Sequence, residues 1–349
     1  MLADKGAPDL TLKLPDNWRR LILGAFAAVC VGLAGCTTPP ATPPPATLPA
    51  TTRPPEVTDA PGETPLPTEP PSTPTLSAAE LTFDGDVAME HVEAQMAIGP
   101  RPAGSEASRL TAEYILSTLA ELGWETEARP FTYQGVEAQN LVARAGQPEG
   151  PVYMFGAHYD TRREADQDPD MPDAPVPGAN DGASGVAVLL ELARVVDLTS
   201  VEGQVWLVFF DAEDNGNLDG WEYIAGSRHF VEEMEVVPEY FVLVDMVGDA
   251  DQQLLLERNS DPVLQALLWE IASELGYADS FIAEPGYSMI DDHTPFLEKG
   301  IPAVDIIDFD YPYWHTTEDT IDKVSAESLE RVGRVLETFI ERGGVYPAR

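Results

Sequence analysis

The chain beyond its first 76 residues alternates between two patterns of apolar residues. Short apolar runs, such as 152–156 and 204–210, are typical of strands that are buried on both faces of a sheet. Longer segments, such as 105–122, space their apolar residues at helical intervals. Because the two patterns alternate, we expect an α/β fold, a three-layer α/β/α sandwich with a mixed, mostly parallel central sheet. The expected helices are 86–97, 105–122, 183–196, 262–275 and 326–340, with a short helix that ends at 230–234, and the expected strands are 140–145, 152–156, 204–210, 239–245, 254–257 and 303–308.

The helical spacing also identifies side chains that we expect to face the core. An amphipathic helix buries the stripe of residues that recurs every three or four positions. In the first two helices this stripe comprises Val87, Met89 and Val92, and then Leu110, Tyr114, Ile115 and Leu119.

The first 35 residues have the features of an export signal. Basic residues precede an apolar stretch at 21–34, which has the length of a signal-peptide core and is short for a bilayer span. The stretch ends in Leu33-Ala34-Gly35-Cys36, which resembles the signal of bacterial lipoproteins, in which the cysteine is acylated. We therefore expect a signal peptide at 1–35, lipidation at Cys36 and an extracytoplasmic protein of the bacterial cell envelope that its lipid holds to the membrane. An ordinary signal peptide or a membrane anchor is the alternative.

Residues 36–76 are dominated by Pro, Thr and Ala, with few large apolar groups. Such a segment cannot bury enough surface to offset the entropy lost on ordering, so we expect a disordered tether in extended, polyproline-like geometry. The remaining residues, 77–349, have the length of one α/β catalytic domain. Cys30 lies inside the expected signal peptide, so the mature chain would hold one cysteine and no intrachain disulfide.

The charge of the chain excludes some classes of partner. Its 60 acidic and 20 basic residues give a formal net charge of −40. Nucleic acids and anionic lipid surfaces are bound by clusters of Lys and Arg, so we expect no nucleic-acid partner, and a membrane contact only through the N-terminal lipid.

Five residues that could bind a metal ion lie mostly where an apolar run gives way to a loop: His158, Asp181, Asp214, Asp245 and His315. In open α/β sheets, ligands bind at the carboxyl ends of the strands, so separate strands can deliver these side chains to one crevice. Imidazole together with carboxylate suits Zn²⁺. Each motif alone is weak, because Asp181 could cap a helix and the other residues could belong to ordinary turns or to the core.

Two further acids have roles beside such a site. Asp160 follows His158 by two positions and could orient the imidazole through its second nitrogen. Glu213 directly precedes Asp214 at the end of an apolar strand, so that one acid could bind the metal while the other transfers protons.

The chain order of these motifs resembles that of the M28 family of zinc peptidases and of the related glutaminyl cyclases, over about residues 86–342. The motifs are His-x-Asp at 158–160, Asn-Asp-Gly at 180–182, the acid pair at 213–214, Asp-Met-x-Gly at 245–248 and the late His-Thr at 315–316. The resemblance implies the zinc-aminopeptidase fold, ligand roles for the five residues above, a metal-bridging Asp181 in two-zinc members, and Glu213 as the proton shuttle. The metal-binding acid of the pair is commonly Glu in this superfamily, whereas the shorter Asp214 stands here.

Several stretches resemble the cyclase branch more than the aminopeptidases, among them Asp291-Asp292-His293 and Trp314 directly before His315. The resemblance implies one zinc held by Asp181, Asp214 and His315 in a cyclase, with Asp245 and Asp291 in a catalytic network of carboxyl groups. In an aminopeptidase, a second zinc would use His158 and Asp245.

The expected substrates are the N-termini of peptides or proteins. The preferred activity is cyclisation of N-terminal Gln to pyroglutamate with release of ammonia, and the alternative is hydrolysis of N-terminal residues. Three aromatic residues could form the wall of a substrate pocket or could equally belong to the core: Trp314, Tyr311 and Trp221. A non-catalytic, tethered protein that binds peptide or zinc is a further alternative, against which Glu213 argues, because binding alone needs no free acid beside the metal.

Overall fold

The computed structural model describes residues 81–346. The expected signal peptide, the acylation site at Cys36 and the tether lie outside the described residues. Among the described helices, none combines the length and the apolar character needed to cross a bilayer.

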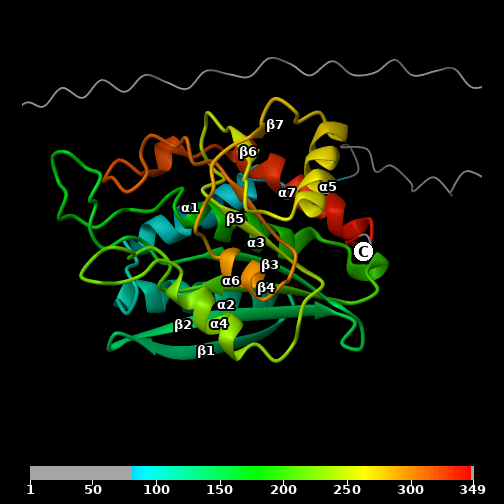
Figure 1. The fold of residues 1–349 in the computed structure, drawn as a ribbon, viewed down its shortest axis with the longest axis horizontal. Helices are drawn as coiled ribbons and strands as arrows, with labels where there is room; N and C mark the ends of the chain where they lie inside the picture. The colour runs from blue at the N-terminus through cyan, green and yellow to red at the C-terminus, as the bar shows by residue number, and fades with distance from the viewer. Residues whose placement is uncertain (1–80, 347–349) are drawn as a thin grey trace, which may run out of the picture. The chain divides into compact units, whose positions relative to one another are not determined.

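A six-stranded sheet forms the centre of the molecule, with the strand order β1-β2-β4-β3-β5-β8 (Figure 1). β3, β4, β5 and β8 run parallel to one another, whereas β2 is antiparallel to both of its neighbours. A separate sheet pairs β6 with β7. The strands are β1 (Glu125–Tyr133), β2 (Val136–Gly146), β3 (Val152–His158), β4 (Gln204–Phe210), β5 (Tyr240–Asp245), β6 (Leu254–Leu256), β7 (Phe281–Pro285) and β8 (Ala303–Ile307).

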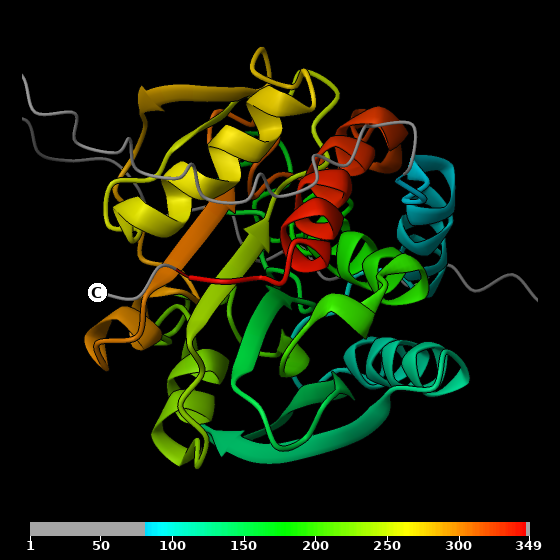
Figure 2. The same ribbon diagram turned by 90° about the vertical axis from the view of Figure 1, so that its right-hand side faces the viewer.

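Helices cover both faces of the central sheet (Figure 2). α2 packs on β1 and β2, α3 packs on β3, and α1 and α7 pack against α3. On the opposite face α4 packs on β2, and α6 packs on α4 and β8. α5 lies on the side of α3 and α7, against α7, β7 and β8, and its buried apolar residues share one core with theirs. The helices are α1 (Gly85–Ile98), α2 (Glu106–Glu121), α3 (Ala183–Val195), α4 (Ala225–Glu233), α5 (Pro262–Glu274), α6 (Thr294–Glu298) and α7 (Ala326–Glu341), with short 3₁₀ turns at Leu198–Ser200 and Ile321–Lys323.

Alternate residues of β4 explain the three layers. Val205, Leu207 and Phe209 belong to the core beneath α3, whereas Trp206, Val208 and Phe210 belong to a second core beneath α4 and α6. A strand that is apolar on both faces needs cover on both faces, which the two helical layers supply. The predicted α/β/α sandwich with a mostly parallel sheet is therefore confirmed.

Some elements differ from the sequence-based expectation. β1, β7 and α6 were not expected, and β1 is a largely polar strand at the edge of the sheet, where one side chain in the strand, that of Phe131, is buried. The expected core face of α2 is partly wrong, because Leu110 is 40% exposed and the small residues Thr111 and Ala112 are buried in its place. Small side chains let the helix approach its neighbours closely, which spacing of large apolar residues does not reveal.

Candidate functional site

The candidate metal ligands lie at one edge of the sheet because the parallel strands end there. His158 is the last residue of β3 and Asp245 is the last residue of β5. Asp214 follows β4 by four positions, and His315 lies in the loop after β8. Asp181 precedes α3. All five side chains are buried.

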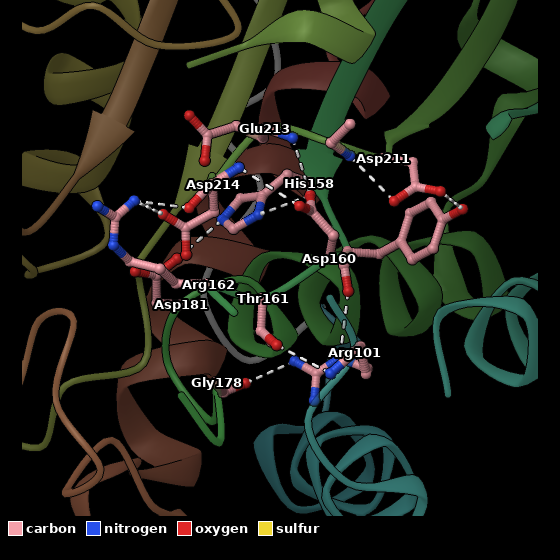
Figure 3. A network of polar contacts seen from close by, with 12 residues as sticks. Arg101, His158, Asp160, Thr161, Arg162, Gly178, Asp181, Asp211, Glu213 and Asp214 are labelled. Carbon is pink, nitrogen blue, oxygen red and sulfur yellow. Dashed lines mark hydrogen bonds and ion pairs between the residues drawn. The ribbon is translucent and has the colours of Figure 1, made fainter. Parts of the chain in front are cut away.

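The five side chains form two clusters that share Asp181. Nε2 of His158 lies 3.1 Å from an oxygen of Asp181 and 3.1 Å from an oxygen of Asp245. Nε2 of His315 lies 2.8 Å from Oδ1 of Asp214 and 3.8 Å from the second oxygen of Asp181. Asp181 therefore directs one carboxylate oxygen toward each histidine (Figure 3 shows His158, Asp181 and Asp214).

These residues fit a zinc ion. Oδ2 of Asp214 is buried and has no hydrogen-bond partner among the described residues, and an unpartnered buried oxygen is costly unless a cation or water contacts it. Each cluster offers one imidazole and two carboxylates within reach of a common point. The structure therefore contains a buried His/Asp site that could hold a metal ion.

Acidic residues also stand behind both imidazoles. An oxygen of Asp160 lies 3.7 Å from Nδ1 of His158, and the same carboxylate accepts hydrogen bonds from the backbone N–H of Glu213 at 3.0 Å and of Asp214 at 3.4 Å. An oxygen of Asp166 lies 3.5 Å from Nδ1 of His315. Asp160 thus links the end of β3 to the acidic turn after β4, in addition to facing the histidine.

Glu213 does not belong to either cluster. Its side chain is 7% exposed, and burial raises its pKa well above its ordinary value. His158 opposes this rise, while the nearby negative charges of Asp214 and Asp291 add to it. A carboxyl group with a raised pKa can hold a proton and release it near neutral pH, as a proton shuttle must.

Asp291 and Asp245 are both buried, and their carboxyl groups interact electrostatically. Burial raises the pKa of Asp291 to about 7, and the charge of Asp245 adds to the effect. Two carboxyl groups that are this close share a proton, because both cannot ionise at low cost.

The three aromatic candidates lie in two different places. The ring of Trp314 is partly exposed and stacks on His315 with a centroid distance of 3.7 Å. Tyr311 is buried and donates its hydroxyl to Asp319 at 2.7 Å. Trp221 packs in another apolar cluster, against Ala212 and Phe131. The three rings therefore do not form one continuous wall.

Reasoning from the sequence missed several residues that hold the site together. Asp319 accepts hydrogen bonds from the backbone N–H groups of Asn180, at 2.9 Å, and Asp181, at 3.2 Å. The buried guanidinium of Arg162 donates to the backbone oxygen of Asp214 at 2.8 Å. Tyr223 lies with its ring nearly parallel to His315, at a centroid distance of 6.4 Å. Arg162 and Asp319 carry charged groups and are buried, but the residues around them in the sequence do not indicate that they are buried.

Arg101 is fully buried, and its role could not be derived from the sequence. Its guanidinium donates to the carbonyl oxygens of Tyr159 at 3.1 Å and Gly178 at 2.7 Å, and also to those of Gly99 and Pro177, at 3.2 Å each (Figure 3). It thereby ties the loop after β3 to the loop that leads to Asp181.

Several residues at the site have backbone conformations that residues other than glycine rarely adopt. Ala212, Met246 and His315 have φ values of 60°, 45° and 56°, in the left-handed region. Each such non-glycine residue costs on the order of 1 kcal/mol, and residues of this kind gather at functional sites. A Cβ at Gly182 would lie 2.7 Å from Cε1 of His158, so glycine is needed where α3 begins against the imidazole.

Comparison with known proteins agrees with this geometry. The family model for peptidase family M28 matches residues 140–340. A mouse glutaminyl-peptide cyclotransferase-like protein is 28% identical over 281 residues, which cover 69% of this chain and 71% of that protein. Aminopeptidase YwaD of Bacillus subtilis is 32% identical over 179 residues, which cover 47% of this chain and 37% of that protein.

Two solved structures resemble the fold closely. The glutaminyl cyclase of Bacteroides thetaiotaomicron bound to N-acetylhistamine superposes with a TM-score of 0.70 at 30% identity, over 74% of this chain and 98% of that chain. A Zn-dependent exopeptidase from Parabacteroides distasonis superposes with a TM-score of 0.69 at 30% identity, over 74% of this chain and 98% of that chain. The chain therefore is an enzyme and belongs to peptidase family M28.

Proposed function

We propose that this enzyme is a glutaminyl cyclase, which converts the N-terminal Gln of a peptide to pyroglutamate and releases ammonia. The observation that carries the proposal is the interaction between the two buried carboxyl groups of Asp245 and Asp291, in which the charge of Asp245 raises the pKa of Asp291. A carboxyl group that shares a proton is a poorer metal ligand than a free carboxylate, so this pairing favours one zinc ion, held by Asp181, Asp214 and His315. Relatives named as glutaminyl-peptide cyclotransferases add support.

In the reaction, the α-amine nitrogen of the N-terminal Gln attacks the carbon of its own γ-carboxamide. A C–N bond forms and closes the five-membered ring, while the bond to the amide nitrogen breaks. Zn²⁺, when bound, would polarise the γ-carbonyl. Glu213 accepts the proton that the α-amine loses and delivers it to the departing nitrogen, which leaves as ammonia. The burial that raises the pKa of Glu213 lets its carboxyl group hold this proton between the two transfers.

Asp245 and Asp291 act as one unit. The proton that they share keeps their combined charge low beside the departing amide. The partly exposed ring of Trp314, stacked on His315, offers an apolar surface to the methylene groups of the substrate Gln.

A specific observation favours the second candidate function, a two-zinc aminopeptidase. Asp181 directs one oxygen to each histidine, as a carboxylate that bridges two metal ions would. With both clusters filled, Glu213 would take a proton from the attacking water and pass it to the new amine of the cleaved peptide.

The two candidates differ in their products and in zinc content. The purified, zinc-loaded full chain is given one peptide that begins with Gln and another that begins with Leu. We expect ammonia and a ring-closed peptide from the first, no free Leu from the second, and about one zinc per chain by metal analysis. Release of free Leu together with two zincs would refute the cyclase proposal.

A variant tests the role of Glu213 in either reaction. Glu213→Gln keeps the size of the side chain but removes its capacity to accept a proton. We expect turnover to fall by at least about a thousandfold, with zinc content unchanged, because a positioned acid–base group contributes factors of about 10² to 10⁴. Activity within tenfold of the wild type would remove Glu213 from this role.

We also propose that Cys36 is acylated and that the enzyme is held at the bacterial cell envelope by this lipid. The support is the Leu33-Ala34-Gly35-Cys36 sequence after the apolar stretch at 21–34. Cys36→Ala should move the protein from the membrane fraction to the soluble fraction, and a lipid-free wild-type protein by mass spectrometry would refute the proposal.

A further inference from the structure

His293 lies outside both metal clusters and has no role in the proposed reaction. It is the residue that precedes α6, and its side chain is fully buried. Nε2 lies 3.5 Å from an oxygen of Glu257, and Nδ1 lies 3.7 Å from an oxygen of Asp305 on β8. The imidazole thus stands between two buried acids, in a row Glu257–His293–Asp305.

The polar side-chain atoms of His293 and Asp305 have no hydrogen-bond partner outside this row among the described residues. These atoms are both ring nitrogens of the histidine and both carboxyl oxygens of Asp305. Buried polar atoms are costly without partners, so the imidazole of His293 and the carboxyl group of Asp305 have only their neighbours in the row to offset the cost of burial.

Glu257 anchors one end of the row to the backbone. It accepts hydrogen bonds from the N–H of Met289 at 2.8 Å, of Asn259 at 2.9 Å and of Ser260 at 2.7 Å. The hydroxyl of Ser260 in turn accepts a hydrogen bond from the N–H of Asp305 at 3.0 Å. Both acids of the row are therefore fixed, and they fix the ring between them.

His293 belongs to the same turn as Asp291. The N–H of Asp292 donates to a side-chain oxygen of Asp291 at 2.6 Å, and the N–H of Thr294 donates to the carbonyl oxygen of Asp291 at 2.7 Å. One carboxyl oxygen of Asp291 is thus held by its own turn. The direction of this carboxyl group relative to Asp245 depends on the position of the turn. His293, in the same turn, contacts Glu257 and Asp305 and so can fix that position.

We propose that His293 is a positioning residue, which holds the 291–294 turn against Glu257 and Asp305 and thereby aims the carboxyl group of Asp291 at Asp245. The proposal rests on the proposed function, in which Asp291 takes part in turnover. The two groups of acids also interact: burial raises the pKa of Asp305 well above its ordinary value, and the charges of Asp291 and Asp245 raise it further.

A double-mutant cycle on the zinc-loaded full chain separates positioning from general support of the fold. His293→Gln should lower kcat at least tenfold, with KM changed less than twofold and zinc content unchanged. In an Asp291→Asn background the same change should lower kcat less than twofold further, measured in single turnovers with excess enzyme, because His293 acts through Asp291. Equal losses in the two backgrounds would overturn the proposal.

The chain offers a matched control and a milder variant. His229 on α4 stacks on Phe131 with a centroid distance of 4.8 Å and is away from the row, so His229→Gln should leave kcat unchanged. If His293→Gln does not fold, Asp305→Asn keeps the ring and removes one acid of the row. It should show the same non-additive loss with Asp291→Asn, and an additive loss would overturn the proposal.

The test of the positioning role of His293 can be distinguished from the test of the proposed function. The cycle uses whichever peptide the wild type turns over, Gln-initiated or Leu-initiated. If the wild type turns over neither, the proposed function is refuted, and a crystal structure of the His293→Gln variant decides the positioning role. Displacement of the Asp291 carboxyl group from Asp245 supports the role, and an unmoved carboxyl group overturns it.

Discussion

Arg101 allows a quantitative prediction, because its guanidinium is fully buried and hydrogen-bonded to four carbonyl oxygens. Hydrogen bonds from a charged donor contribute about 1.5 kcal/mol each at the lower end of their range, so the four together contribute about 6 kcal/mol. Burial lowers the pKa of Arg101 from 12.5 to about 10, in spite of the nearby charges of Asp319, Asp160 and Asp181, which corresponds to a cost of about 3 kcal/mol for the buried charge. The balance is a stabilisation of about 3 kcal/mol.

We therefore expect Arg101→Met to lower the free energy of unfolding by about 3 kcal/mol. Arg101→Lys should lower it by a similar amount, because one ammonium group cannot reach carbonyl oxygens that are arranged for a planar fork. Urea unfolding, followed by tryptophan fluorescence in the presence of a chelator, measures the change without a contribution from metal.

Arg109 provides the control for these variants. It is exposed on α2 and pairs with Glu106 and Glu113. Exposed ion pairs contribute less than about 1 kcal/mol, so Arg109→Met should be almost neutral. If Arg101→Met unfolds within 0.5 kcal/mol of the wild type, about the precision of such a comparison, Arg101 does not stabilise the loops of the site as described.

Three further predictions concern pH, packing and metal. Burial raises the pKa of Asp308 from 3.8 to about 7, so its contribution to stability is full below about pH 4 and is lost as the pH rises to 7. Asp308→Asn should therefore gain about 4 kcal/mol over the wild type at pH 8 and almost nothing at pH 4, and an equal gain at both would contradict this. Gly182→Ala should weaken zinc binding at least about tenfold in competition with a coloured chelator, because the added Cβ would displace His158; unchanged affinity would show that the ring tolerates it. Removal of zinc should lower Tm by on the order of 10 °C relative to protein at a zinc concentration about a thousand times Kd, and an unchanged Tm would argue against a tight site.

The sequence predicts best the elements that are apolar on both faces. β4 has the expected bounds, 204–210, because all of its residues after Gln204 belong to one core or the other. β1 could not be predicted in this way, since an edge strand with solvent on one side has few apolar residues to mark it. Leu110 was placed on the wrong face because helical spacing identifies an apolar stripe, but not whether a neighbouring helix needs small residues for close packing.

The same limit applies to the site. The five His and Asp side chains could be found because each follows a recognisable pattern in the chain, and the structure brings them together. The roles of Arg101 and Asp319 could not be found, because most of their partners are backbone groups 58 to 139 positions away in the chain. A hydrogen bond to a distant carbonyl or N–H group leaves no pattern in the residues around the donor or acceptor.

The sharing of Asp181 between two clusters has a consequence for how the protein acquires metal. His158 and His315 belong to strand ends and loops that come together when β3, β4, β5 and β8 have assembled into one sheet. No short fragment of the chain contains a complete ligand set, so tight chelation requires the finished tertiary structure. Zinc uptake should accordingly report the last step of folding, and a chain that is still unfolded should hold no tightly bound zinc.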